Sequence, residues 1–236
     1  GDWSSDVCSS DLEKRIKKIK LKQQDKGLLT AYFEDYLHFG GMPEFVLNGN
    51  RDYLQSVVDD IIYKDIVAFH GLKNGHLLKD FFFLLMERAG KQVSINKIAN
   101  ILGISPDTAR RYLALFEETF LIYLVPRFGK TNDTILSTKK IYAADLGIRN
   151  LFTGFRDKGA LFENAVFQKI KHLNPRYVFE DGLELDFITE NKTLIEVKYG
   201  REIENKQRAL FERYSASKKC LIGSVNDYIN IEQILF

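Results

Sequence analysis

The chain has few of the residues that stabilise small secreted or zinc-containing folds. Two cysteines, Cys8 and Cys220, and four histidines occur among its 236 residues. They are too few and too scattered for a disulfide framework or a typical structural zinc site, and they fit a reducing compartment. No apolar run approaches the roughly 20 residues of a membrane-spanning helix, and no secretory signal is visible. The composition predicts a cytoplasmic protein without a membrane partner.

A large excess of charge of one sign is also missing. The net charge is +2, and residues 13–26 carry seven basic and two acidic residues, so the rest of the chain is slightly acidic. Nucleic-acid-binding domains usually carry a basic face. A short basic segment of this kind is more often a solvated helix or tether.

Residues 1–12, GDWSSDVCSSDL, have neither helical nor strand periodicity. The string resembles the conceptual translation of a sequencing adapter. We therefore expect these residues, Cys8 included, to contribute nothing to the fold, and the natural N-terminus to be missing.

Helical patterns dominate the next part of the chain. Residues 13–75 are expected to be a helical segment, broken by two glycines and a proline within 40–43. One helix should cover residues 51–69, because its apolar residues are spaced to form one face. A further helix is expected from His76 to Arg88.

Residues 76–143 predict a winged helix-turn-helix. Ser94 and Ser105 can each cap a helix, Gly103 ends the first, and Pro106 opens the second. Strands at 120–125 and 139–143 would flank a polar loop, the wing. The side chains of the second helix that should point inward are Ala109, Tyr112, Leu113 and Phe116.

The tripeptide Gly129-Lys130-Thr131 resembles the end of a phosphate-binding loop. That motif requires another glycine five residues before Gly129, and Leu124 stands there. We therefore expect no nucleotide-binding loop in this chain.

From residue 144 onward the pattern changes to α-β-β-β-α-β. Helices are expected at 159–173 and 202–214, and strands at 176–179, 183–188, 193–199 and 219–222. The whole chain is thus expected to be a multi-domain α+β or α/β protein.

Two of these strands carry a charged face. Alternation places Glu184 and Asp186 on one face of their strand, and Glu196 and Lys198 on one face of the next. A turn centred on Asn191 would put Asp186 opposite Glu196. Facing carboxylates repel each other, and Mg²⁺ held by two carboxylates, water and substrate phosphate would compensate.

Such a site suits metal-assisted phosphodiester hydrolysis, with Lys198 holding or polarising the attacking water. The alternative from the residues alone is a solvated hairpin with an ion pair between Glu184 and Lys198.

The order of Asp186, Glu196 and Lys198 is similar to the PD-(D/E)xK nuclease motif, with Leu185 in the place of its proline. Glu163, in GALFENAVF, looks like the helical acidic residue of that superfamily. The resemblance implies a restriction-endonuclease-like domain over residues 144–236. Its catalytic residues would be Glu163, Asp186, Glu196 and Lys198, and its metal ligands Asp186 and Glu196.

A longer set of segments resembles the C-terminal half of prokaryotic AAA-type ATPases carrying domain of unknown function 4143. The segments that carry this resemblance are GGMPE, IIYKDIV, VSINKIANILGISPDTARRYLALFEETFLI, KKIYAADLGIRN, GALFENAVF, ELDF and IEVK. The resemblance implies a longer parent protein that binds ATP in a domain missing here, with which this chain would associate.

Three functions remain open from the sequence. The C-terminal domain could be a Mg²⁺-dependent nuclease, or an inactive nuclease fold that serves as a sensor or docks another protein. Alternatively, the winged helix could bind DNA through Arg110 and Arg111. Residues 90–125 carry four basic and three acidic residues, and Asp107 lies near the helix start. This balance favours a scaffold role for the winged helix, since phosphate contacts dominate DNA affinity.

Overall fold

The computed structural model describes residues 23–235. The chain divides into two units between residues 34 and 35, and this boundary falls within helix α2 (Gln23–Phe39). The expectations for residues 1–12, for Cys8 and for the start of the basic segment lie outside the described residues. The following paragraphs concern the unit that begins at Asp35.

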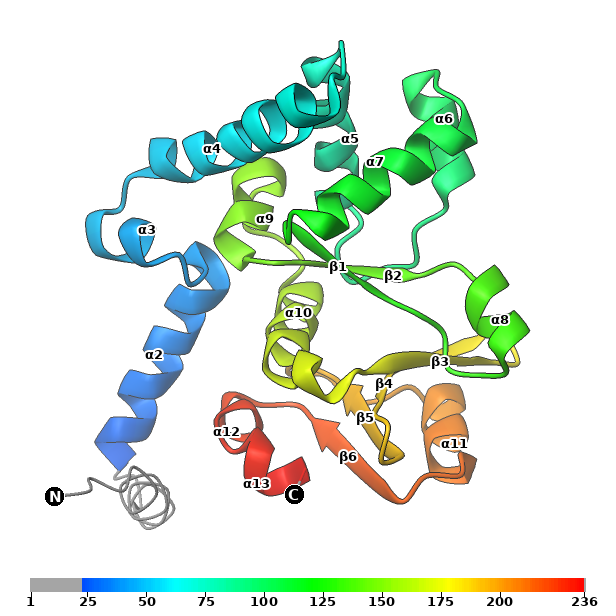
Figure 1. Cartoon of the computed structure of the whole chain (residues 1–236). Coiled ribbons are helices and arrows are strands. Elements are labelled where there is room, and N and C mark those ends of the chain that lie inside the picture. Colours follow the sequence, from blue (N-terminus) through cyan, green and yellow to red (C-terminus); the bar gives the residue numbers. More distant parts are fainter. Residues whose placement is uncertain (1–22, 236) are drawn as a thin grey trace, which may run out of the picture. The chain divides into compact units, whose positions relative to one another are not determined.

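This unit is a mixed α and β structure with two small sheets (Figure 1). After α2, its helices are α3 (Pro43–Asn48), α4 (Arg51–Asp60), η1 (Ile61–Ala68), α5 (Gly75–Met86), α6 (Ile95–Leu102), α7 (Pro106–Glu118), α8 (Thr131–Leu136), α9 (Leu146–Thr153), α10 (Lys158–Ile170), η2 (Lys171–Leu173), α11 (Asn205–Arg213), α12 (Val225–Ile229) and α13 (Ile231–Leu235). Its strands are β1 (Ile122–Val125), β2 (Lys140–Ala143), β3 (Arg176–Glu180), β4 (Leu183–Ile188), β5 (Thr193–Val197) and β6 (Lys218–Ile222). No described helix is long and apolar enough to cross a membrane.

The helix expected over residues 51–69 changes type along its length. It is α-helical to Asp60 and continues as the π-helix η1 to Ala68. Ile62 and Ile66 of η1 are fully buried, so the apolar face predicted from the spacing is still directed inward. Long π-helices are rare, because most appear as single turns within α-helices, and the apolar spacing alone gave no sign of one.

The glycine pair before α3 packs closely against the start of α9. Asp145 caps α9 by accepting a hydrogen bond from the amide of Ile148 at 3.0 Å, and it also accepts one from the amide of Gly41 at 2.7 Å. Gly40 has a φ of +76°, and a Cβ there would lie 2.3 Å from both Asp145 and the Gly147 nitrogen. Gly40 is thus required by both the turn and the close approach, whereas a Cβ at Gly41 would only make an ordinary contact with Tyr36 at 3.4 Å.

The predicted helix-turn-helix caps are present. Ser94 and Ser105 accept hydrogen bonds from the amides of Lys97 and Thr108, and Gly103 ends α6 in the left-handed conformation. The inward face of α7 differs in one position. Leu115 is buried in the core, whereas Leu113 packs against the core but is only partly buried.

The connection expected to be a polar wing contains a short helix. β1 and β2 pair antiparallel, with Ile122 opposite Ala143, and α8 lies between them in the sequence. Gly129 and Lys130 therefore lie between β1 and α8, and Thr131 is the first residue of α8, whereas a polar hairpin loop was expected from the sequence. The missing glycine at Leu124 remains the argument against a phosphate-binding loop.

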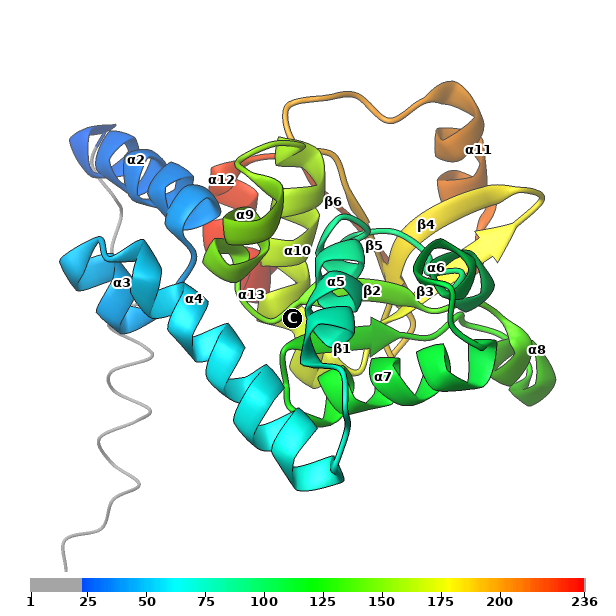
Figure 2. The ribbon, with the colours of Figure 1, turned by 90° about the horizontal axis from the view of Figure 1, so that it is seen from above.

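The second sheet has the order β3-β4-β5-β6. Its first three strands are antiparallel neighbours, and β6 runs parallel to β5. Helix α10 contacts β2 and β5, and α11 contacts β4 (Figure 2). One apolar core extends from Phe45 to Ile148 and so includes residues on both sides of the predicted boundary at 75/76. The domain boundaries at 75/76 and 143/144 stay predictions.

Candidate functional site

The hairpin of β4 and β5 has the register predicted from the sequence. Phe187 lies opposite Ile195 and Ile188 opposite Leu194, which centres the turn on Asn191. The next pair outward is therefore Asp186 and Glu196. The residue with a left-handed backbone in this turn is Lys192, with a φ of 61°, rather than Asn191.

Asp186 and Glu196 are held by the backbone of the opposite strand. The amide of Asp186 donates to Oε2 of Glu196 at 3.2 Å, and the amide of Val197 donates to Oδ2 of Asp186 at 2.9 Å. Asp186 is 5% exposed and Glu196 is fully buried. Two carboxylates are thus brought together at a position largely shielded from solvent.

A lysine that the sequence analysis did not single out lies among the acidic residues. Lys140 of β2 is 1% exposed, and its Nζ lies 2.7 Å from Oε1 of Glu163 and 2.7 Å from Oε1 of Glu184. The same Nζ lies 3.4 Å from Oδ1 of Asp186. Glu163 on α10 therefore reaches the same place as Asp186, as expected, and Lys140 connects them. We call this group the acidic cluster; it comprises Lys140, Glu163, Glu184, Asp186, Glu196 and Lys198.

Tyr142 and Gln207 complete the hydrogen bonding of the cluster. The hydroxyl of Tyr142 donates to Oε1 of Glu163 at 2.6 Å. Nε2 of Gln207, on α11, donates to Oε1 of Glu196 at 2.7 Å and to the carbonyl of Glu184 at 2.8 Å. The signal that could have revealed Lys140 and Tyr142 is their spacing, because residues i and i+2 of a strand share a face. For Gln207 the sequence offers no comparable signal.

Lys198 and Glu184 form ion pairs with other residues, and not with each other as in the solvated-hairpin alternative. Nζ of Lys198 lies 2.5 Å from Oε1 of Glu196, and Glu184 pairs with Lys140. Nε2 of Gln92 also donates to Oε2 of Glu184 at 2.8 Å. Glu184 and Lys198, both within the described part of the chain, therefore do not form the ion pair expected in that alternative. The side chain of Lys198 is 22% exposed, so the cluster reaches solvent there.

Burial and mutual repulsion make ionisation of the carboxylates costly. Burial first, and then the charge of Asp186, raise the pKa of Glu163 to about 7 and that of Glu196 to about 8. Burial alone would lower the pKa of Lys140, but the charges around it, led by Glu163, raise it well above its usual value. Lys140 is thus a fixed positive charge, whereas Glu163 and Glu196 titrate near neutral pH.

No group of three or more His, Cys, Asp or Glu side chains within residues 23–235 is arranged to hold a metal ion. A cation at this cluster would therefore have fewer protein ligands. Mg²⁺ commonly binds through one or two carboxylates and completes its shell with water and substrate phosphate. The pair Asp186 and Glu196 matches this smaller donor set.

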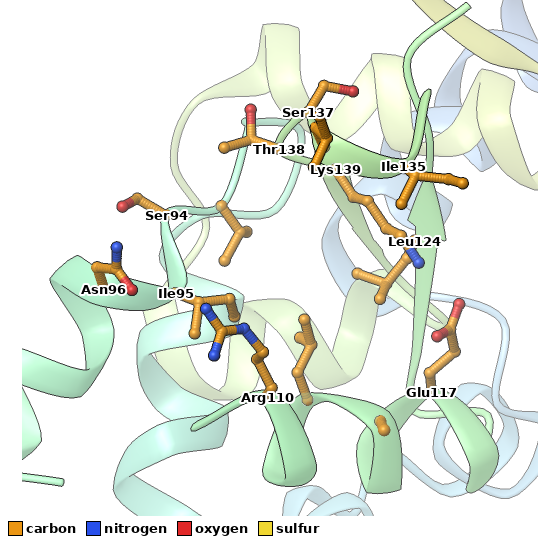
Figure 3. Close-up of a pocket in the computed structure, with 14 residues that line it drawn as sticks. Ser94, Ile95, Asn96, Arg110, Glu117, Leu124, Ile135, Ser137, Thr138 and Lys139 are labelled. Carbon is orange, nitrogen blue, oxygen red and sulfur yellow. The ribbon is translucent and has the colours of Figure 1, made fainter. Parts of the chain in front are cut away.

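A groove of about 460 Å³ lies elsewhere, beside α7. Figure 3 shows Arg110, Glu117, Ile135 and Lys139 around it. Arg110 is ion-paired with Asp107 at 2.6 Å, and Arg111 is exposed but does not line the groove. The two arginines named as nucleic-acid contacts are therefore not brought to one concave surface, and the charge of Arg110 is already compensated.

The comparisons with known proteins identify relatives without an assigned function. An uncharacterized protein of Methanocaldococcus jannaschii is 32% identical over 90% of this chain, and one of Haemophilus influenzae is 30% identical over 68% of it. A second uncharacterized protein of Methanocaldococcus jannaschii is 25% identical over 92% of the chain. The chain covers 53%, 44% and 50% of these relatives, so it spans about half their length. No solved structure matches.

The comparisons also correct the family assignment made from the motifs. The family model that matches residues 30–159 is Domain of unknown function (DUF8612), not domain of unknown function 4143. The resemblance to AAA-type ATPases was therefore wrong, and the ATP-binding parent and the ATPase-domain partner that it implied lose their basis. Since the match covers more than half of the chain, the protein belongs to the DUF8612 family.

Proposed function

We propose that the acidic cluster is the site of a divalent-cation-dependent hydrolase that cleaves phosphodiester bonds of nucleic acid. In this proposal α10, β3 to β5, α11 and β6 form a restriction-endonuclease-like arrangement, and α5 to β2 a winged helix. The observation that carries the proposal is the placement of Asp186 and Glu196 on adjacent strands, each hydrogen-bonded to the other strand's backbone.

The charge of the cluster supports binding of a cation. Its four carboxylates face two ammonium groups, which leaves a formal charge of −2 when all are ionised. Buried charge is costly unless it is compensated. Without a cation, protons compensate, because the pKa values of Glu163 and Glu196 lie at about 7 and about 8. One divalent cation would neutralise the cluster and displace these protons.

Asp186 and Glu196 would hold the cation, and its chemistry there would be to stabilise the charge that develops on the phosphate. Other residues of the protein would orient the two carboxylates and the substrate. Lys198, which is partly exposed, is placed to hold the attacking water or the phosphate, and Gln207 keeps Glu196 in position. The backbone amide of Val197 fixes Asp186.

One observation favours a second candidate, an inactive nuclease fold that docks another protein. Lys140 already pairs with Glu163, Glu184 and Asp186, so these carboxylates have a cationic partner in the protein itself. The DNA-binding winged helix has less support, because Arg110 is paired with Asp107.

The test measures cation binding and cleavage separately on the full chain. Millimolar Mn²⁺ or Mg²⁺ should raise the melting temperature by mass action. Asp186→Asn should weaken this effect. The matched control is Asp181→Asn, which alters an exposed carboxylate paired with Arg213 and should leave the effect unchanged.

Cleavage is then followed on fluorescently labelled single- and double-stranded DNA and RNA. Lys198→Ala should keep the cation-dependent stabilisation and remove the cleavage. If the wild-type chain shows no stabilisation at millimolar cation, the hydrolase proposal is wrong and the docking function replaces it.

A further inference from the structure

Lys140 enters the acidic cluster from outside the sheet that carries most of it. Glu184, Asp186, Glu196 and Lys198 lie on or beside β4 and β5, whereas Lys140 lies on β2, in the other sheet. Its neighbour Lys139 has its side chain on the groove beside α7 (Figure 3). Alternation along this segment therefore directs one lysine to the surface and the next into the cluster.

The ammonium group of Lys140 donates hydrogen bonds to Glu163 at 2.7 Å and to Asp186 at 3.4 Å. It also forms an ion pair with Glu184 at 2.7 Å. A buried ammonium is stable only when its charge and its donors are satisfied in this way. Lys140 is therefore a permanent cation of the site, held by residues of α10 and β4.

Asp186 lies between this lysine and the partner strand. Its Oδ1 faces Lys140, and its Oδ2 accepts from the amide of Val197, beside Glu196. In two-cation hydrolytic sites, two metal ions lie about 3.5–4 Å apart and together stabilise the attacking and leaving oxygens. In this structure the ammonium group of Lys140 lies on the Oδ1 side of Asp186.

We infer that Lys140 fills the position of a second cation, so that the site takes one divalent cation rather than two. This inference rests on the proposed function. It adds the number of divalent cations that the site binds and identifies Lys140 as the residue that determines this number. With Lys140 present, the carboxylates of Glu163, Glu184 and Asp186 already share a cationic partner. Without Lys140 the formal charge is −3, and the carboxylates of Glu163, Glu184 and Asp186 face a vacated position.

The experiment counts the Mn²⁺ ions bound per full chain, by calorimetry and by the electron paramagnetic resonance signal of free Mn²⁺. Wild type should bind one Mn²⁺, and Lys140→Met should bind two. Lys139→Met is the matched control, because it removes a lysine one residue away that lies outside the cluster, and it should bind one.

A second variant guards against misfolding of Lys140→Met. The double variant Lys140→Met, Glu184→Gln removes one positive and one negative group, so the formal charge stays as in wild type. It keeps Glu163 and Asp186 at the vacated position, and it should also bind two Mn²⁺.

Two Mn²⁺ in the wild type, or one in the folded Lys140 variants, would overturn the inference and leave the proposed function standing. No Mn²⁺ in the wild type would overturn both.

Discussion

The backbone amide of Asp186 donates a hydrogen bond to Oε2 of Glu196, ten residues later in the chain, at 3.2 Å. The reciprocal contact runs from the amide of Val197 to Oδ2 of Asp186. Each carboxylate is thus fixed by the other's strand, so the pair depends on the hairpin register. A shift of one residue would direct Glu196 to the opposite face from Asp186.

The first prediction concerns the pH dependence of stability. The pKa values of Glu163 and Glu196, about 7 and about 8, lie above the value of about 4.3 for an unfolded glutamate. The folded state therefore binds more protons between these values, and the stability that this provides is complete below pH 4.3. The free energy of unfolding should fall as the pH rises toward 8, by up to about 1.4 kcal/mol per pH unit for each carboxyl.

Urea denaturation at pH 5 to 8 in the presence of a chelator measures this slope. Glu196→Gln should flatten it, because the amide stays neutral. Glu212→Gln, an exposed glutamate of α11, should leave it unchanged. An identical slope in wild type and Glu196→Gln would show that Glu196 ionises normally.

The second prediction concerns Gln207, which donates to Oε1 of Glu196 at 2.7 Å. Gln207→Leu should weaken Mn²⁺ binding by roughly 10–100-fold, the usual effect of losing a group that orients a metal ligand. Calorimetric titration measures the affinity. Lys206→Leu, at an exposed position of the same helix, is the control. Unchanged affinity in Gln207→Leu would mean that Glu196 needs no support from α11.

The third prediction separates the two leucines of α7. Leu115 is 5% exposed and belongs to the apolar core, so Leu115→Ala should lower the free energy of unfolding by roughly 2–5 kcal/mol. Leu113 is only partly buried and lines the groove, so Leu113→Ala should cost clearly less. Chemical denaturation compares the two. Equal losses would contradict the orientation of α7.

The fourth prediction concerns the close contact of Gly40 with Asp145 and Gly147. A Cβ at Gly40 would lie 2.3 Å from the Gly147 nitrogen, whereas a Cβ at Gly49 would meet nothing within 4 Å. Both glycines have positive φ, at +76° and +65°, so both alanine variants carry the same kind of backbone strain. Gly40→Ala should cost roughly 1–3 kcal/mol more than Gly49→Ala, because of the added overlap. Similar melting temperatures would contradict the close packing.

Local features of the fold could be read from the sequence alone. Ser94, Gly103 and Ser105 delimit α6 and α7, because capping and helix termination depend on groups only a few residues away. The hairpin register was predictable for the same reason, since the two-residue period of a strand and a short turn determine which side chains share a face. This local information already paired Asp186 with Glu196.

The surroundings of that pair were decided by the tertiary structure. Lys140 lies 46 residues from Asp186 in the chain. Strand alternation places it on the same face as Tyr142, but no local pattern indicates that this face of β2 points into the cluster. The same is true of Leu115, buried where Leu113 was expected, because the packing of α7 against its neighbours selects the inward face. Strand alternation and a short turn, which are both local, are enough to pair the two carboxylates across β4 and β5. The charge balance around them depends on long-range contacts, because these place the buried lysine that compensates them.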